Sequence, residues 1–387
     1  MNGKSIVRIH VFAVQPISTC IVQPRRERSS MNEKRRIIFH IDMDHFFTAI
    51  EEREHPEIKG QPVIVGADPK EGKGRGVVST CNYAARKFGV RSGMPISKAW
   101  KLCPQAVYLP VNYAVYEKVS NEIMQSLRKY ADKFEQWGID EAFLDVTSRT
   151  EDYAEAENLA RQIKADIKKS QQLTCSIGIG PNKLVAKIAS DFQKPDGLTT
   201  VEEREVQRFL RPLSVRKLLW VGRKTEEKLH NISINTVGDL AQVDPTILTE
   251  VFGSFGTQLY LSAQGIDRSE VEERTGVKSI SRETTFQEDT ADHSTILEAM
   301  NDLAMQVCDD ALKQRLHFKT VTIKVRYENF ETHTHSKTLP FITNRPQDLK
   351  KVSAELLMPS LEADRKVRLV GVRITSLVSA EKQKTLA

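Results

Sequence analysis

Residues 37–47 read IIFHIDMDHFF, a hydrophobic run that ends in two acidic residues and two phenylalanines. The part from Ile37 to Asp42 predicts a buried strand, because short apolar runs bounded by polar residues are typical of strands inside a sheet. Phe46–Arg53 then has the spacing of a helix. A carboxylate at the end of a buried strand is unfavourable unless it is paired, hydrogen-bonded or bound to a metal. Asp42 is therefore a candidate functional residue.

A second acidic motif occupies residues 137–145, which read WGIDEAFLD. Asp140 and Glu141 lie there between hydrophobic residues, in a stretch that predicts a pair of strands. Carboxylates that converge at a sheet edge repel one another, and Mg²⁺ suits them because it binds one or two carboxylates together with substrate phosphates and water. A single acid near a strand end is more often a cap or a turn residue. We therefore leave Asp44 and Asp145 outside the expected metal site.

The composition sets limits on the class of protein. A chain of 387 residues predicts two to four domains. The formal charge of +6 is compatible with a polyanionic partner without requiring one. Five scattered cysteines without a CxxC pair argue against a disulfide framework or a zinc site, and they suit a reducing cytoplasm. No apolar run approaches the roughly 20 residues that span a bilayer.

The order of patterns along the chain predicts several parts. Strand, helix, strand, strand, helix and strand up to Ile179 indicate a split βαβ sheet with helices on one face, and Pro181 is expected at the first position of the next helix. Residues 202–265 read as short helices and residues 270–277 as a charged linker. Thr320–Tyr327 alternates between apolar and polar residues, which predicts a strand with an apolar back and a basic front.

The first residues differ from the rest of the chain. The apolar stretch Ile6–Val22 is interrupted by charged residues and proline, so it is a poor signal peptide. We expect residues 1–33 to be a disordered extension or a misassigned start, because Met31 directly precedes the first convincing structured segment.

Four motifs together carry a resemblance to a known family. They read IDMDHFFTAIE (41–51), NYAARKFGVRSGMP (82–95), GIDEAFLDVT (138–147) and GIGPNKLVAKIASDFQKPDG (178–197). Their order and spacing resemble those of Y-family translesion DNA polymerases of the DinB type. The resemblance extends from about residue 34 to about residue 378.

The resemblance implies a multidomain α+β fold, a right-hand polymerase with a split βαβ palm. The expected parts are a palm (34–45 and 112–201), small fingers (46–111), a helical thumb with a helix-hairpin-helix (202–268), a linker (269–278), an α/β little finger (279–380) and a tail (381–387).

The resemblance also implies the catalytic residues. Asp42, Asp140 and Glu141 correspond to the carboxylates that bind two Mg²⁺ ions, with the Met43 backbone carbonyl as a further ligand. Asp42 and Asp140 are expected to span both ions, and Glu141 to hold the ion next to the primer 3′-hydroxyl. That hydroxyl then attacks the α-phosphorus of a dNTP.

The remaining implied residues surround the nucleotide. Triphosphate contacts are expected from Thr80, Tyr83, Arg86 and Lys194. Phe47 corresponds to the aromatic residue that excludes the 2′-hydroxyl of a ribonucleotide. Gly76 and Val77 correspond to a small roof above the nascent base pair, which tolerates damaged template bases. Residues 72–76 lack the GxxxxGK[ST] pattern of a phosphate-binding loop and read instead as a mobile fingers loop.

DNA contacts are expected from the thumb and the little finger, namely from Gly222, Arg223, Lys224, Arg282, Lys324 and Arg326. The thumb turn departs from the family pattern, since Trp220 replaces its first glycine. The implied partners are primer–template DNA and dNTPs. The protein itself is expected to be a monomer in the cytoplasm. A sliding clamp is a family-level expectation, with only Gln383 and Leu386 hinting at a clamp-binding peptide.

Two other classes of protein use parts of the same pattern. A nucleotidyl cyclase also has a split βαβ palm with metal-binding carboxylates, but it needs neither the hairpin thumb nor the basic sheet. A catalytically silent DNA-binding scaffold needs the thumb and the sheet but not the three acids.

Overall fold

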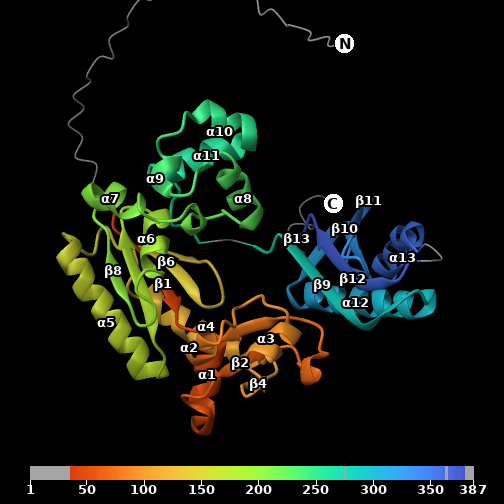
Figure 1. Cartoon of the computed structure of the whole chain (residues 1–387). Coiled ribbons are helices and arrows are strands. Elements are labelled where there is room, and N and C mark those ends of the chain that lie inside the picture. Colours follow the sequence, from red (N-terminus) through yellow and green to blue (C-terminus); the bar gives the residue numbers. More distant parts are fainter. Residues whose placement is uncertain (1–34, 274–275, 362–364, 380–387) are drawn as a thin grey trace, which may run out of the picture. The chain divides into compact units, whose positions relative to one another are not determined.

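The computed structural model describes residues 35–273, 276–361 and 365–379 (Figure 1). The expectations for the N-terminal extension and the C-terminal tail fall almost entirely outside these residues. Among the described residues, every helix is too short or too polar to span a bilayer. The described cysteines Cys81, Cys103, Cys175 and Cys308 are free and buried.

The sheet that carries both acidic motifs has the strand order β5-β6-β1-β7-β8. Its strands are β1 (Ile38–Met43), β5 (Lys133–Gln136), β6 (Glu141–Asp145), β7 (Cys175–Gly180) and β8 (Leu198–Thr200). The central strand β1 is antiparallel to both β6 and β7, whereas β8 is parallel to β7. This order is the one expected of a split βαβ sheet.

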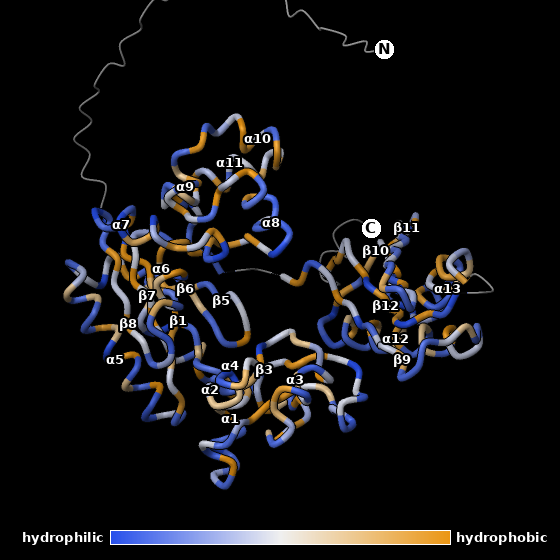
Figure 2. The backbone as a smooth tube through the Cα atoms, in the orientation of Figure 1, coloured by the Kyte–Doolittle hydropathy of each residue, from blue (hydrophilic) through white to orange (hydrophobic). Residues whose placement is uncertain are grey.

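Helices cover both faces of this sheet. On one face, α4 (Tyr113–Arg128) and α5 (Tyr153–Gln171) pack against Phe39 and Ile41. Hydrophobic and hydrophilic residues both occur along α5, as expected of a helix with one buried side (Figure 2). On the other face, α6 (Lys183–Ser190) packs against β1 and β7, with Ala186 next to Ile38. The two helices of the predicted pattern, α4 and α5, thus share one face as expected, and α6, which follows the pattern, covers the other face.

The start of α6 also differs from expectation. Asn182 caps the helix, because its side chain accepts a hydrogen bond from the Val185 N–H. Asn is among the strongest capping residues, so Pro181 lies before the cap rather than at the first helical position.

A smaller sheet has the order β3-β2-β4 and forms the part expected to be the fingers. Its strands are β2 (Val63–Gly66), β3 (Val78–Cys81) and β4 (Val107–Leu109), and its helices are α1 (Phe46–Glu54), α2 (Tyr83–Lys87) and α3 (Ile96–Leu102). The glycine-rich segment between β2 and β3 forms a tight turn, since the N–H groups of Gly72 and Gly74 both donate to the Pro69 carbonyl.

The next part is helical. It contains α7 (Val206–Leu210), α8 (Arg223–Asn231), α9 (Val237–Leu240), α10 (Pro245–Phe252) and α11 (Ser254–Ala263). These short helices share a core that includes Leu229, Leu240 and Leu259. The expectation of short helices over residues 202–265 is confirmed.

The last part contains a third sheet, of order β11-β10-β12-β9, whose strand pairs are all antiparallel. Its elements are β9 (Ser279–Thr290), α12 (His293–Lys313), β10 (Leu316–Tyr327), β11 (Thr332–Thr343), α13 (Pro346–Leu357), β12 (Val367–Thr375) and β13 (Val378–Ser379), which pairs with β10. Val321, Ile323 and Val325 are fully buried against α12 and α13, whereas Lys324 and Arg326 are partly exposed. The predicted alternation in β10 is confirmed.

The segment expected to be a charged linker is partly packed. Val271 is completely buried, in a cluster with Phe143 and Ala186 of the first sheet. Glu270 pairs with Lys133 at 3.0 Å. Val271 thus anchors this segment to the first sheet, although the charged residues around it had indicated a linker.

A buried ion pair lies beside this anchor. Lys183 Nζ and Glu135 Oε2 are 2.6 Å apart, and both side chains are less than 10% exposed. The ammonium group also lies 5.2 Å and 5.1 Å from the ring centroids of Trp137 and Phe143.

We predict that Glu135→Leu lowers the stability by about 3–5 kcal/mol, because it leaves the buried ammonium of Lys183 without its partner. The double variant Glu135→Leu/Lys183→Met should regain much of this loss, since two apolar side chains need no compensation. Thermal and denaturant unfolding measure both effects. Glu227→Ala is the control, because its pair with Arg223 is exposed and is expected to contribute less than about 1 kcal/mol. A double variant no more stable than Glu135→Leu would contradict this account.

Candidate active site

The three predicted acids lie together because of strand pairing. Asp42, next to last in β1, is the register partner of Glu141, the first residue of β6. Asp140 directly precedes β6, and its carbonyl accepts the Met43 N–H at 2.9 Å. The two acidic motifs, which are far apart in the sequence, thus meet at one end of the central strands.

Lys194 lies against the first of these acids. Its ammonium is 2.6 Å from Asp42 and 2.9 Å from Asp191. Burial raises the pKa of Asp42, and the Lys194 charge opposes this rise. Burial would lower the pKa of Lys194, but the two carboxylates outweigh it and raise that pKa. Lys194 is therefore a fixed positive charge beside the acids.

Glu141 has a different environment. Its Oε2 lies 3.1 Å from His40 Nε2 and also accepts a hydrogen bond from the Lys187 ammonium. Burial would raise the pKa of Glu141, but the hydrogen bond with His40 and the Lys187 charge outweigh it and lower the pKa to about 2. Glu141 is thus ionised at any ordinary pH.

Among the described residues, none forms an ion pair with Asp140, and Lys194 lowers its pKa only through its nearby charge. Burial, together with the negative charges of Asp42 and Glu141, raises its pKa to about 6 from an ordinary value of 3.8. This rise in the pKa of Asp140 shows that the three carboxylates repel one another and that a cation at this place would relieve the repulsion.

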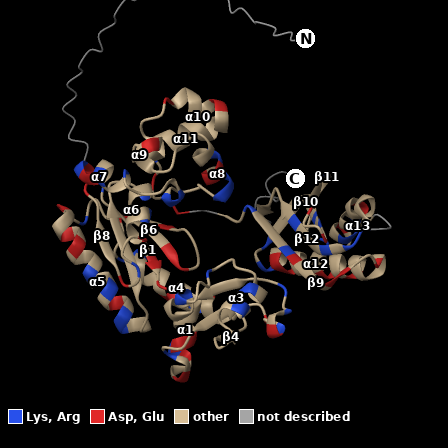
Figure 3. Cartoon of the chain, viewed as in Figure 1, with Lys and Arg blue, Asp and Glu red and all other residues tan. Residues whose placement is uncertain are grey.

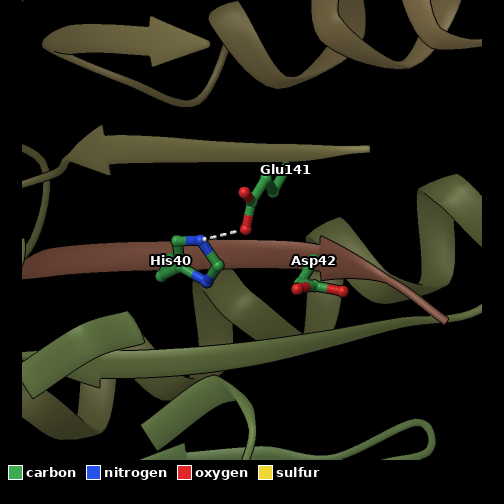
Figure 4. A group of neighbouring side chains, drawn as sticks. All are labelled: His40, Asp42 and Glu141. Atoms are coloured by element: carbon green, nitrogen blue, oxygen red, sulfur yellow. Dashed lines mark hydrogen bonds and ion pairs between the residues drawn. The ribbon is translucent and has the colours of Figure 1, made fainter. Parts of the chain in front are cut away.

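The donor set fits a divalent metal ion. Ligand atoms of His40, Asp42 and Glu141 all lie within 4.8 Å of one another (Figure 4). Carboxylate and carbonyl oxygens are the ligands that Mg²⁺ prefers, and Asp140 and the Met43 carbonyl belong to the same strand ends. The residues present therefore fit the expected metal site.

His40 was missed at the level of sequence. It is completely buried, yet both of its ring nitrogens are engaged, Nδ1 with Ser190 Oγ at 2.8 Å and Nε2 with Glu141. The alternation of side chains in a strand could have indicated His40, because residues 40 and 42 must point to the same face of β1.

Asp44 and Asp145 have structural partners. The buried carboxylate of Asp44 accepts hydrogen bonds from the Thr174 and Ser176 hydroxyls and from the Asp196 N–H, each at 2.8 Å. Asp145 accepts the Thr147 N–H at 3.0 Å. Neither acid belongs to the group of neighbouring ligand atoms around Asp42 and Glu141.

Three of the four expected triphosphate contacts lie on β3 and α2. Tyr83 and Arg86 share one face of α2, with the Arg86 guanidinium 4.7 Å from the Tyr83 ring centroid. The Tyr83 hydroxyl oxygen is buried and, among the described residues, has no hydrogen-bond partner. A buried orphan hydroxyl is unfavourable, and a phosphate oxygen would satisfy it. Thr80 lies in the adjoining strand β3.

Phe47 packs in an aromatic group. Its ring stacks on Tyr116, with centroids 4.2 Å apart and an interplanar angle of 15°. Tyr113 meets the same ring edge-on at 6.1 Å. Phe47 is only 9% exposed, so its position is fixed by packing.

Gly76 and Val77, the residues expected to form a small roof, are exposed. Gly76 has φ +109°, and a Cβ there would lie 2.6 Å from the Ala67 Cβ. Only glycine fits this position.

The expected DNA contacts of the thumb lie at the start of α8. Gly222 is the N-cap of α8, and Arg223 and Lys224 follow in its first turn. Trp220 takes φ +68°, the region that glycine usually fills, and is 69% exposed. Trp220 thus takes a backbone conformation that favours glycine.

The basic residues of the last sheet have partners. Arg282 pairs with Asp310 at 2.7 Å, Lys324 pairs with Glu283 at 2.7 Å, and Arg326 donates to the Thr332 hydroxyl at 2.9 Å. Figure 3 shows acidic and basic residues together on β9. The expected basic front therefore carries compensating acids.

Comparisons with known proteins agree with this geometry. A family model described as the impB/mucB/samB family matches residues 41–191, and the model of its C-terminal domain matches residues 277–386. A model described as the thumb domain of DNA polymerase-iota matches residues 218–267.

Named relatives extend the match over nearly the whole chain. DNA polymerase IV 2 of Methanosarcina mazei is 46% identical over 94% of this chain and 99% of its own. DNA polymerase IV of Methanoculleus marisnigri is 50% identical over 88% of this chain and 94% of its own.

Solved structures also match. A Y-family DNA polymerase chimera of Dbh and Dpo4 is 32% identical with a TM-score of 0.82, covering 89% of this chain and 99% of that chain. An insertion ternary complex of Dbh DNA polymerase is 31% identical with a TM-score of 0.64 and the same coverage.

The chain belongs to the Y family of DNA polymerases. Within that family it is similar over most of its length to proteins named DNA polymerase IV. The multidomain α+β polymerase fold is thereby confirmed, and a DNA partner and the use of a divalent metal follow from the family. The domain boundaries and the roles of individual site residues stay predictions.

The raised pKa of Asp140 predicts how stability depends on pH in the metal-free protein. The folded protein binds this proton more tightly than the unfolded chain does, so the stabilisation is fully present below about pH 4 and is lost as the pH rises through about 6. Asp140→Asn should therefore be more stable than the parent at pH 7.5 in EDTA, by up to about 3 kcal/mol. The difference should shrink as the pH approaches 4.

Thermal unfolding across this pH range measures the effect, with Asp132→Asn as the control, since that acid pairs with Arg149 at the surface. An Asp140→Asn stability gain that stays constant with pH would contradict the assigned cause.

Proposed function

We propose that this chain extends a DNA primer along a template, including past damaged template bases, with the acids of β1 and β6 as its catalytic centre. The observation that carries the proposal is the close approach of Asp42, Asp140 and Glu141 at one end of the central strands, beside the fixed charge of Lys194. Family membership supports the reaction, which is template-directed nucleotidyl transfer from a dNTP to a primer 3′-hydroxyl.

The acids would hold two Mg²⁺ ions. Asp42 and Asp140 would contact both ions, the Met43 carbonyl one, and Glu141 the ion nearest the primer end. When bound, the ions supply an activated 3′-hydroxyl and neutralise charge on the phosphates. The protein's own contribution is to place these oxygens on paired strands, where backbone hydrogen bonds fix their spacing.

The triphosphate would lie along β3, α2 and Lys194. The orphan hydroxyl of Tyr83 and the forked guanidinium of Arg86 suit phosphate oxygens. Lys194 would exchange its carboxylate partners for phosphate oxygens, which its raised pKa favours because the charge is retained. Thr80 supplies a further hydroxyl nearby.

The residues expected above the nascent base pair would discriminate only weakly between template bases. Exposed Gly76 and Val77 would leave space above the nascent base pair, so bulky or distorted bases fit, and discrimination by shape is correspondingly weak. Primer–template phosphates would contact Gly222, Arg223 and Lys224 at the start of α8, and Arg282, Lys324 and Arg326 on the last sheet. Such contacts position the duplex without reading its sequence.

The expectations of a monomer, a cytoplasmic location and a sliding-clamp partner rest on the family and on the sequence. The buried free cysteines suit a reducing compartment. The residues that hint at a clamp peptide, Gln383 and Leu386, lie outside the described part of the chain.

Phe47→Ala should increase ribonucleotide incorporation relative to deoxyribonucleotide incorporation by about 100-fold or more, since the ring that excludes a 2′-hydroxyl is lost and a steric clash of a few kcal/mol is removed. Single-nucleotide kinetics with dNTP and rNTP measure the ratio. Tyr113→Ala, which removes a neighbouring ring, is the control. An unchanged ratio in a folded Phe47→Ala variant would refute the sugar-excluding role.

Primer extension on plain and abasic templates tests the function as a whole. We expect distributive, Mg²⁺-dependent extension that continues past the abasic site. Asp140→Ala should abolish synthesis while DNA affinity changes little. Folded protein that binds primer–template without extending it would favour the scaffold alternative, and conversion of a nucleoside triphosphate without a template would favour a cyclase.

A further inference from the structure

One buried residue near the acids has no role in the function described so far. His40 lies in β1, two residues before Asp42, on the face covered by α6. The side chain is completely buried, with its ring 4.6 Å from the Phe143 ring. A histidine inside a sheet is unfavourable unless its polar atoms are satisfied, and here both ring nitrogens have partners.

The two partners are of different kinds. Nδ1 faces the Ser190 hydroxyl at 2.8 Å, at the end of α6, and Nε2 faces Glu141 Oε2 at 3.1 Å. A carboxylate only accepts hydrogen bonds, so Nε2 must carry the ring proton of a neutral imidazole and donate it to Glu141. Nδ1 then faces the Ser190 hydroxyl, which also donates to the Lys187 carbonyl at 2.8 Å. Ser190 thus holds the imidazole ring in place beside Glu141.

A second donor acts on the same oxygen of Glu141. The Lys187 ammonium donates to Oε2 and lies 3.3 Å from His40 Nε2. Lys187 and Ser190 both belong to α6, so this helix supplies one donor directly and the other through His40. The second oxygen of Glu141 takes no part in these contacts. It lies 3.5 Å from the point where a Gly138 Cβ would be, and so does Asp140 Oδ1.

We propose that His40 is a positioning residue for the metal site, which holds one oxygen of Glu141 so that the other faces the metal together with the oxygens of Asp42 and Asp140. The hydrogen-bond chain runs from Ser190 through His40 to Glu141. Groups that hydrogen-bond to a metal ligand in this way fix its orientation, and their loss typically weakens metal binding by about 10–100-fold. The inference rests on the proposed role of Glu141 as a metal ligand.

Two substitutions of nearly equal size separate this role from simple core packing. In His40→Gln the side-chain amide reaches the position of Nε2 and donates to Glu141. In His40→Asn the amide is shorter, reaches only the position of Nδ1 and faces Ser190. Both variants leave space in the core and introduce one amide, so a purely structural role predicts similar effects from the two.

The measurement is binding of Mn²⁺, by electron paramagnetic resonance, to the full chain with primer–template, a dideoxy-terminated primer and the matching dNTP. His40→Asn should weaken the affinity for one of the bound ions by about 10-fold or more, whereas His40→Gln should stay within about threefold of the parent. The KM for dNTP and the Kd for DNA should change little, so the loss in extension appears in kcat.

Ser190→Ala tests the same role even if the His40 variants fail to fold, because it leaves the imidazole in place. It removes the hydroxyl that holds the imidazole ring and should weaken Mn²⁺ binding in the same direction, by a smaller factor. Equal Mn²⁺ affinities in the Gln and Asn variants, or an Asn variant with the affinity of the parent, would overturn the positioning role.

Glu141→Gln separates this outcome from failure of the proposed function. If Glu141→Gln weakens Mn²⁺ binding and the His40 variants do not, only the role of His40 is wrong. If Glu141→Gln leaves Mn²⁺ binding unchanged, the assignment of Glu141 as a ligand is itself wrong, and the positioning role fails with it.

Discussion

The antiparallel pairing of β1 with β6 is the constraint on which the rest of the site depends. It places Asp42 opposite Glu141 and brings Asp140 to the same end of the sheet. Strand pairing fixes this register through backbone hydrogen bonds and through the burial of alternate residues such as Phe39 and Ile41. A slip of one residue would turn the acids toward the hydrophobic helices α4 and α5. The core of the sheet therefore enforces the close approach of three negative charges.

The charges are balanced by groups from a single region of the chain. Lys187 belongs to α6, and Lys194 lies in the loop directly after it. Within the described part of the chain no cation contacts Asp140 directly, and its pKa rises to about 6. The site is thus arranged so that its net charge is largely compensated, while one carboxylate stays poised for a cation. Electrostatic strain of this kind is typical of functional sites rather than of stable cores.

Much of this arrangement could be predicted from the sequence. The hydrophobic residues that precede Asp42 and those that follow Glu141 mark two buried strands, and the alternation in β10 marks a strand of the last sheet. Other features depend on contacts that no local pattern encodes. His40 meets Ser190, which is 150 residues away, so a lone histidine in an apolar strand gave no sign of its partner. The residues of α6 are buried nearly all round, and its position on the second face follows from the rest of the fold. Val271 was hidden among charges, and Asn182 displaced Pro181 because a side-chain cap outweighs the preference of proline.

Asp44 connects parts of the site that otherwise look independent. Its carboxylate holds the Asp196 N–H, two residues beyond Lys194, and it also ties the end of β1 to Thr174 and Ser176. The strand end that presents Asp42 is therefore the anchor of the loop that presents Lys194. A shift of that strand end would move both groups at once, so the distance between acid and lysine is kept even when their common support moves. The positions of Asp42 and Lys194 are therefore linked, so a substitution that shifts one of these groups is expected to shift the other.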